Sequence, residues 1–123
     1  MIKNKVLIVE DEAIIALEIE DRLMKLGYQV CGTASSAEKA IAIAEQTSPD
    51  LILMDVKLKG KMNGLEAAEI IRIRFNIPSI ILTAFMDERP DGPAGELKPH
   101  YLIKPIIEEE LKNAINDILK NSV

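Results

Sequence analysis

The sequence predicts an α/β fold in which helices cover both faces of a five-stranded parallel β-sheet. Short runs rich in Val, Ile and Leu alternate with helix-length amphipathic segments from one end of the chain to the other. The apolar runs are continuous, which is typical of strands buried on both faces. Alternating strands and helices also require right-handed crossovers and therefore a mainly parallel, doubly wound sheet.

The first strand and helix are predicted from the segment KVLIVEDEAIIALEIEDRLMKLG, residues 5–27. KVLIV is a short apolar run followed by acids, which is typical of a buried strand ending at a polar edge. Glycine is a common helix-terminating residue, and Gly27 closes the segment. The helix is expected to bury one face, made of Ile15, Ile19, Leu23 and Leu26.

A second strand and helix are predicted in residues 28–48, followed by a third strand. YQVCGTA has the composition of a strand, and Ser35 with Glu38 matches a capping box at a helix start. Pro49 then interrupts the chain before the apolar run LILM. The expected buried stripe of this helix contains Ala37, Ala40, Ile41 and Ala44.

The remaining elements follow the same alternation except at one place. PSIILTA and HYLIK predict the fourth and fifth strands. Segment 86–99 between them contains three prolines and two glycines, so the helix expected there should be short, irregular or displaced. The helices before and after these strands are predicted from the apolar positions Ala67, Ile71, Phe75, Leu111, Ile115, Ile118 and Leu119.

Length and composition limit the classes of protein that remain. A chain of 123 residues with 48% apolar residues fits one domain, residues 1–123. No apolar run is long enough to cross a bilayer and no signal peptide is evident, so we expect a cytoplasmic protein without membrane insertion. A net charge of −5 without a basic cluster argues against direct nucleic-acid binding.

Polar and charged residues stand where the predicted strands end. In an open parallel sheet, ligands bind at the carboxyl ends of the strands, so these residues are expected to share one edge. Any one of them alone would be ordinary turn or cap chemistry, but together they indicate a site. The set comprises Glu10, Asp11, Glu12, Asp55, Thr83 and Lys104, and Pro105 directly follows Lys104.

The chemistry of this set points to a metal ion and to phosphoryl transfer. Several carboxylates held close together repel one another and stay ionised only beside a cation. Oxygen ligands of this kind favour Mg²⁺, or alternatively Mn²⁺. Asp55 has the character of a nucleophile, while Lys104 and Thr83 are suited to neutralise the charge on phosphoryl oxygens.

The chain resembles the response-regulator receiver domains of two-component signalling over essentially its whole length. The matching motifs, in order, are LIVEDE, DLILMD, NGLEA, IILTA and YLIKP. The resemblance implies the flavodoxin-like strand order 2-1-3-4-5. It also implies a switch that accepts phosphate from a histidine kinase or phosphotransfer protein and acts on a downstream protein, with a possible homodimer linked to phosphorylation.

The resemblance assigns roles to individual residues. Asp55 is the implied phosphoacceptor. The implied Mg²⁺ ligands are Asp11, Asp55, the backbone carbonyl of Lys57 and, through water, Glu10. Thr83, Ala84 and Lys104 would contact the phosphoryl group, with a cis peptide bond expected between Lys104 and Pro105. Tyr101 matches the aromatic switch position, although a tyrosine that simply packs in its strand is the alternative. Lys57 and Phe85 occupy the positions that tune dephosphorylation, and the bulk of Phe85 suggests a long-lived phosphoform.

Three other functions are compatible with parts of this pattern. A haloacid-dehalogenase-type phosphatase needs a second Asp two residues after the nucleophile, where this chain has Lys57, so turnover of an external substrate is not expected. An FMN-binding flavodoxin needs a neutral phosphate loop, whereas VEDEAI would repel phosphate. An interaction module that works without phosphorylation is the third alternative, and the intact Asp55, Thr83 and Lys104 argue against it.

Overall fold

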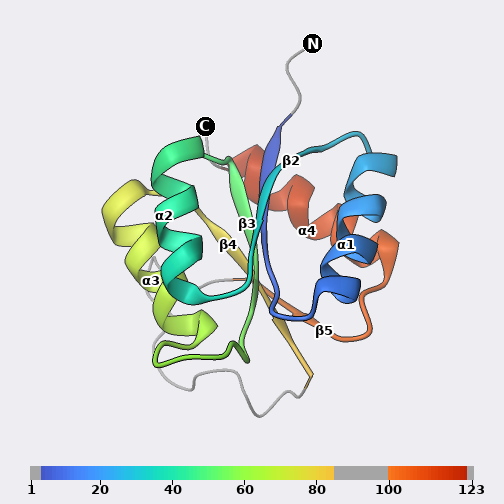
Figure 1. Ribbon diagram of the computed structural model, residues 1–123. Helices are drawn as coiled ribbons and strands as arrows, with labels where there is room; N and C mark the ends of the chain where they lie inside the picture. Colours follow the sequence, from blue (N-terminus) through green and yellow to red (C-terminus); the bar gives the residue numbers. More distant parts are fainter. Residues whose placement is uncertain (1–3, 85–99, 122–123) are drawn as a thin grey trace.

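A computed structural model of the protein describes residues 4–84 and 100–121 and confirms the predicted fold class (Figure 1). Five strands form one sheet in the order β2-β1-β3-β4-β5, and every neighbouring pair is parallel. Four helices lie in the described segments. The elements are β1 (Lys5–Val9), α1 (Ala13–Lys25), β2 (Gln29–Ala34), α2 (Ala37–Thr47), β3 (Leu51–Asp55), α3 (Gly64–Phe75), β4 (Ser79–Thr83), β5 (His100–Ile103) and α4 (Glu108–Asn121).

The sheet separates two layers of helices, as Figure 1 shows, and a hydrophobic cluster fills the space on each face. On one face α2 and α3 pack against Leu7, Ile52 and Ile81, and on the other α1 and α4 pack against Ile8 and Leu53. Strand side chains alternate between the two layers because successive residues point to opposite faces. The central strands β3 and β4 are buried along their whole length, whereas the edge strands β2 and β5 remain partly exposed.

The helix stripes match the prediction, but one helix start does not. The cap of α2 is Ser36, whose side-chain oxygen accepts a hydrogen bond from the backbone of Lys39 at 3.2 Å. The predicted capping box of Ser35 and Glu38 is therefore wrong, because a helix that begins one residue later places lysine at the reciprocal position. A complete capping box does form at the start of α3. The irregular helix expected in 86–99 lies outside the described residues.

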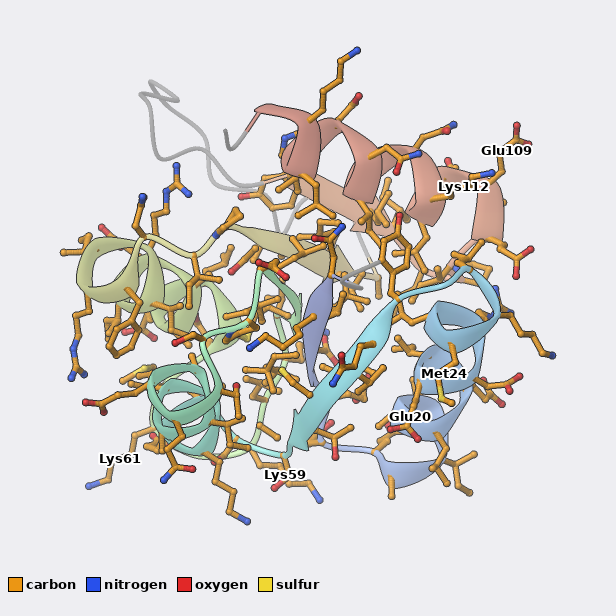
Figure 2. All side chains as sticks on the ribbon, turned by 90° about the horizontal axis from the view of Figure 1, so that it is seen from above. Glu20, Met24, Lys59, Lys61, Glu109 and Lys112 are labelled. Atoms are coloured by element: carbon orange, nitrogen blue, oxygen red, sulfur yellow. The ribbon has the colours of Figure 1, made fainter. Side chains whose placement is uncertain are left out.

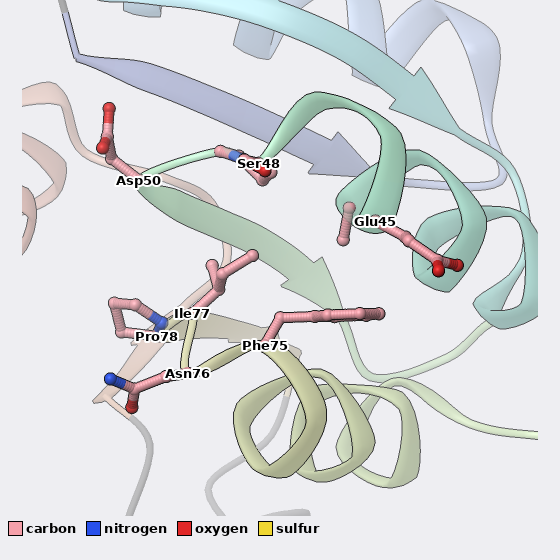
Figure 3. Close-up of a pocket in the computed structure, with 9 residues that line it drawn as sticks. Glu45, Ser48, Asp50, Phe75, Asn76, Ile77 and Pro78 are labelled. Carbon is pink, nitrogen blue, oxygen red and sulfur yellow. The ribbon is translucent and has the colours of Figure 1, made fainter.

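A pocket of about 400 Å³ lies between the carboxyl ends of α2 and α3 (Figure 3). Its lining includes Glu45 and Phe75 together with residues that immediately precede β3 and β4. The pocket therefore faces the amino ends of these strands, opposite to the edge where the sequence predicts a site. In residues 4–84 and 100–121, no helix combines the length and apolarity needed to cross a membrane.

Candidate functional site

Glu10 and Asp55 meet because of the register between two central strands. Val9 of β1 pairs with Met54 of β3. The residues that follow them, Glu10 and Asp55, therefore lie side by side. Strand alternation directs both side chains to the face covered by α1 and α4, since Ile8 and Leu53 belong to that layer. The two residues are only 4% and 6% exposed. Such buried carboxylates need a positively charged or hydrogen-bonding partner.

Lys104 supplies the positive charge. It follows β5, and its Nζ lies 3.0 Å from Asp55 Oδ2 and 3.4 Å from Glu10 Oε1. Its backbone N–H also donates to the Thr83 carbonyl oxygen at 2.8 Å, which ties the end of β5 to the end of β4. The peptide bond between Lys104 and Pro105 is cis. One ammonium thus bridges two carboxylates that come from different strands.

Asp11 completes a cluster of three carboxylates. Ligand oxygens of Glu10, Asp11 and Asp55 all lie within 4.8 Å of one another. The Glu12 and Lys57 backbone N–H groups donate to Glu10 Oε2 and Asp55 Oδ1, each at 3.1 Å. Three carboxylates beside one ammonium leave net negative charge at a partly buried edge. This donor set fits a hard divalent cation such as Mg²⁺.

The electrostatics of the cluster appear in the pKa values of its members. Burial raises the pKa of Glu10 from 4.5 to about 7, and the neighbouring charge of Asp55 adds to this rise. The Glu12 N–H and the Lys104 ammonium oppose it. For Lys104, burial alone would lower the pKa, but hydrogen bonds and charges from Asp55 and Glu10 raise it above its ordinary value. The site therefore holds protons more tightly than the isolated side chains do, which means that it favours added positive charge.

The raised pKa of Glu10 predicts a pH dependence of stability for the metal-free protein. Because the folded state holds this proton more tightly than the unfolded chain, the contribution of Glu10 to the free energy of unfolding should fall by about 1–3 kcal/mol as the pH rises from about 4.5 to about 7. Lys104 adds no slope in this window, since its pKa is high in both states. Urea unfolding in a chelator should show the decline in wild type and lose it in Glu10→Gln. An identical pH profile for the two proteins would contradict the prediction.

Thr83 and Tyr101 lie on the other face of the sheet edge. Thr83 ends β4 and is 1% exposed, and it has the same strand parity as Ile81, which contacts α2 and α3. Tyr101 pairs with Ile81 across β4 and β5 and packs against the same layer, with its hydroxyl oxygen buried. Both therefore share the α2 and α3 face, beside the edge that carries Asp55. Ala84 is exposed directly after Thr83. Phe85 lies outside the described residues.

Both ends of the loop between β3 and α3 lie close to Asp55, the candidate phosphoacceptor. Lys57 stands beside Asp55, while the Lys59 and Lys61 side chains are exposed and extend outward in Figure 2. At the far end of the loop, the Gly64 N–H donates to the Val56 carbonyl oxygen at 3.0 Å. A β-carbon at Gly64 would overlap the Asp55 carbonyl oxygen. Sequence reasoning missed this role, although the motif NGLEA contains the glycine.

The chain matches a family model described as the response regulator receiver domain over residues 6–116. It is 36% identical to the transcriptional regulatory protein PdtaR of Mycobacterium tuberculosis over 118 residues, covering 93% of this chain and 56% of that protein. The chain thus spans about half the length of the curated relatives it matches, such as PdtaR at 56% and PhyR of Methylorubrum extorquens at 43%. These relatives are named as regulators, not as enzymes that act on external substrates.

Solved structures agree with the family match. The signal receiver domain of a modulated diguanylate cyclase from Desulfovibrio desulfuricans G20 is 32% identical, with a TM-score of 0.87 and coverage of 97% of this chain and 95% of that one. The anti-anti-sigma factor PhyR from Bartonella quintana is 33% identical, with a TM-score of 0.81 over 98% of this chain and 49% of that one. The chain belongs to the response regulator receiver domain family.

Proposed function

We propose that this receiver domain is a phosphorylation-dependent switch whose acceptor is Asp55, with Mg²⁺ as its cofactor. The observation that carries the proposal is the environment of the Asp55 carboxylate. Its two oxygens contact the Lys104 ammonium and the Lys57 N–H, and the carboxylates of Glu10 and Asp11 stand beside it. These are the parts that transfer of a phosphoryl group to a carboxylate requires.

In the proposed transfer, a carboxylate oxygen of Asp55 attacks the phosphorus of the donor. The bond from phosphorus to the leaving group breaks, and the leaving group departs with the electron pair. Lys104 lies within hydrogen-bond distance of Asp55 and is placed to compensate charge on the incoming phosphoryl oxygens. Glu10, Asp11, Asp55 and the Lys57 carbonyl are the proposed ligands of Mg²⁺, which would offset the negative charge when bound.

Thr83 and Tyr101 are the proposed route from phosphate to the output surface. Asp55 pairs with Leu82, so Thr83 lies one residue further along, at the carboxyl edge of the sheet. Although the two side chains leave the sheet on opposite faces, the Thr83 hydroxyl is suited to approach a phosphoryl oxygen that extends beyond this edge. Tyr101 packs in the layer that Thr83 faces, so a shift of Thr83 would alter the space available to the ring. The proposed phosphoryl source is a histidine kinase or phosphotransfer protein, and the proposed reader of the switch is a downstream protein. Removing the ring in Tyr101→Ala should weaken target binding without preventing phosphorylation.

Intact mass spectrometry after incubation with acetyl phosphate tests the acceptor. Wild type should gain one phosphoryl group in the presence of Mg²⁺, while Asp55→Asn should gain none because an amide cannot form the acyl phosphate. Asp117→Asn, which changes an exposed aspartate on α4, serves as the matched control and should behave as wild type.

A wild-type protein that gains no phosphoryl group under any of these conditions would reject the proposal. That result would favour an interaction module that works without phosphorylation. The similarity to PhyR, a protein named as an anti-anti-sigma factor, makes this the second candidate function. An adduct that persists in Asp55→Asn would instead locate the acceptor on another residue.

A further inference from the structure

Arg22 links two segments that are distant in sequence. It lies in the last turn of α1, and its Nη1 donates to the carbonyl oxygen of Ile106 at 2.8 Å, across 84 positions of the chain. The arginine is half-buried, so this hydrogen bond is partly shielded from water. α1 and α4 cover the same face of the sheet (Figure 1), and the Ile106 side chain packs in the layer between them.

Ile106 belongs to the short segment that carries Lys104 from β5 into α4. The segment is fixed at its start, where the Lys104 N–H donates to the Thr83 carbonyl oxygen at 2.8 Å. It is fixed again at its end, where the Leu111 N–H donates to the Ile107 carbonyl oxygen at 3.0 Å. Arg22 holds the segment between these two points. Its bond reaches a carbonyl only two residues beyond Lys104.

The position of this segment determines where the Lys104 ammonium can reach. A lysine side chain is long and flexible, so its charged end is placed accurately only when its backbone is held. The ammonium must span from the end of β5 to Asp55 and Glu10, which it contacts at 3.0 and 3.4 Å. We propose that Arg22 is a positioning residue for phosphorylation, which acts by holding the Lys104 segment against α1.

This inference rests on the proposed function, because it assigns Arg22 a role in the use of Lys104. It also predicts which property of the site should stay intact. The proposed Mg²⁺ ligands Glu10 and Asp11 precede the first turn of α1, whereas Arg22 lies in its last turn. Removing the guanidinium should therefore slow phosphorylation without weakening Mg²⁺ binding. An arginine that only stabilised the fold would show no such separation.

A double-mutant cycle on the phosphorylation rate tests the role of Arg22. The rate of Asp55 phosphorylation by acetyl phosphate at saturating Mg²⁺ is measured for wild type, Arg22→Met, Lys104→Ala and the double variant, at a temperature where all are folded. Arg22→Met should be about 3- to 10-fold slower than wild type. In the Lys104→Ala background the same change should have no further effect, since the two residues act through one ammonium.

Two further variants distinguish positioning from loss of charge or stability. Arg22→Lys keeps a donor that can reach a carbonyl and should recover part of the rate. Lys25→Met removes another cation from the last turn of α1, one whose ion pair with Asp21 is exposed to solvent, and should leave the rate unchanged. Equal rates for Arg22→Met and wild type, or an equal slowing in the Lys104→Ala background, would overturn the proposal.

Amide hydrogen exchange provides a readout that does not need phosphorylation. In Arg22→Met the Lys104 amide, which donates to Thr83, should exchange faster. The Val56 amide, which donates to the Leu82 carbonyl oxygen at 3.1 Å, should keep its protection. Unchanged protection at Lys104 would overturn the positioning role even if wild type formed no adduct. The failure of this inference and that of the proposed function are thus distinguishable.

Discussion

Replacing Gly64 with alanine is expected to destabilise the protein by about 3 kcal/mol or more, because the new methyl group has no space. A β-carbon at this position would overlap the carbonyl oxygen of Asp55 and lie 2.8 Å from its carbonyl carbon. It would also lie 3.0 Å from Met54 Cγ. A backbone group cannot move away as a flexible side chain can, so β3 and α3 would have to separate. The same shift would displace Asp55 from Lys104.

Urea unfolding of Gly64→Ala measures this cost, and Gly27→Ala is the matched control. Gly27 ends α1 with φ +95° and has open space around it, so alanine there meets only backbone strain. We expect that control to lose about 1 kcal/mol. A loss for Gly64→Ala no larger than for Gly27→Ala would show that α3 can move away from β3 at little cost. Phosphorylation of Gly64→Ala should also be slower than that of wild type.

Replacing Lys104 with alanine is expected to change two properties of the site in opposite directions. Mg²⁺ should bind more tightly, because the Lys104 ammonium neutralises Asp55 and Glu10 and repels a second cation. Phosphorylation by acetyl phosphate should nevertheless slow by about 10²- to 10³-fold, because the charge that develops on the phosphoryl oxygens loses its partner. A change in overall stability alone would not raise the Mg²⁺ affinity and lower the phosphorylation rate at the same time.

Calorimetric Mg²⁺ titration and the phosphorylation rate measure the two effects in the same samples. Lys112→Ala removes an exposed lysine from α4 and should leave both values unchanged. Weaker Mg²⁺ binding in Lys104→Ala would mean that the lysine orients the carboxylates instead of competing with the ion. An unchanged phosphorylation rate would remove Lys104 from the proposed mechanism.

Much of the fold was accessible from local sequence patterns. Continuous apolar runs identified the strands, and helical spacing identified the buried stripes, for example Ile19 and Leu23 in α1. The strand order and the family are also confirmed. The start of α2 was missed by one residue, because two consecutive serines offer equivalent caps and only the path of the chain selects Ser36. The roles proposed for Thr83, Tyr101 and the Mg²⁺ ligands stay predictions.

The sequence by itself determined which residues stand at the carboxyl ends of the strands, because strand and helix periodicity is a local property. Only the tertiary structure decided which of them touch. Glu10 and Lys104 are 94 positions apart, and their contact depends on how β1, β3, β4 and β5 are aligned. The raised pKa of Glu10 and the close approach of Gly64 to Asp55 also arise from the packing of separate elements against one another. Burial and distance depend on packing between segments, which local patterns do not specify.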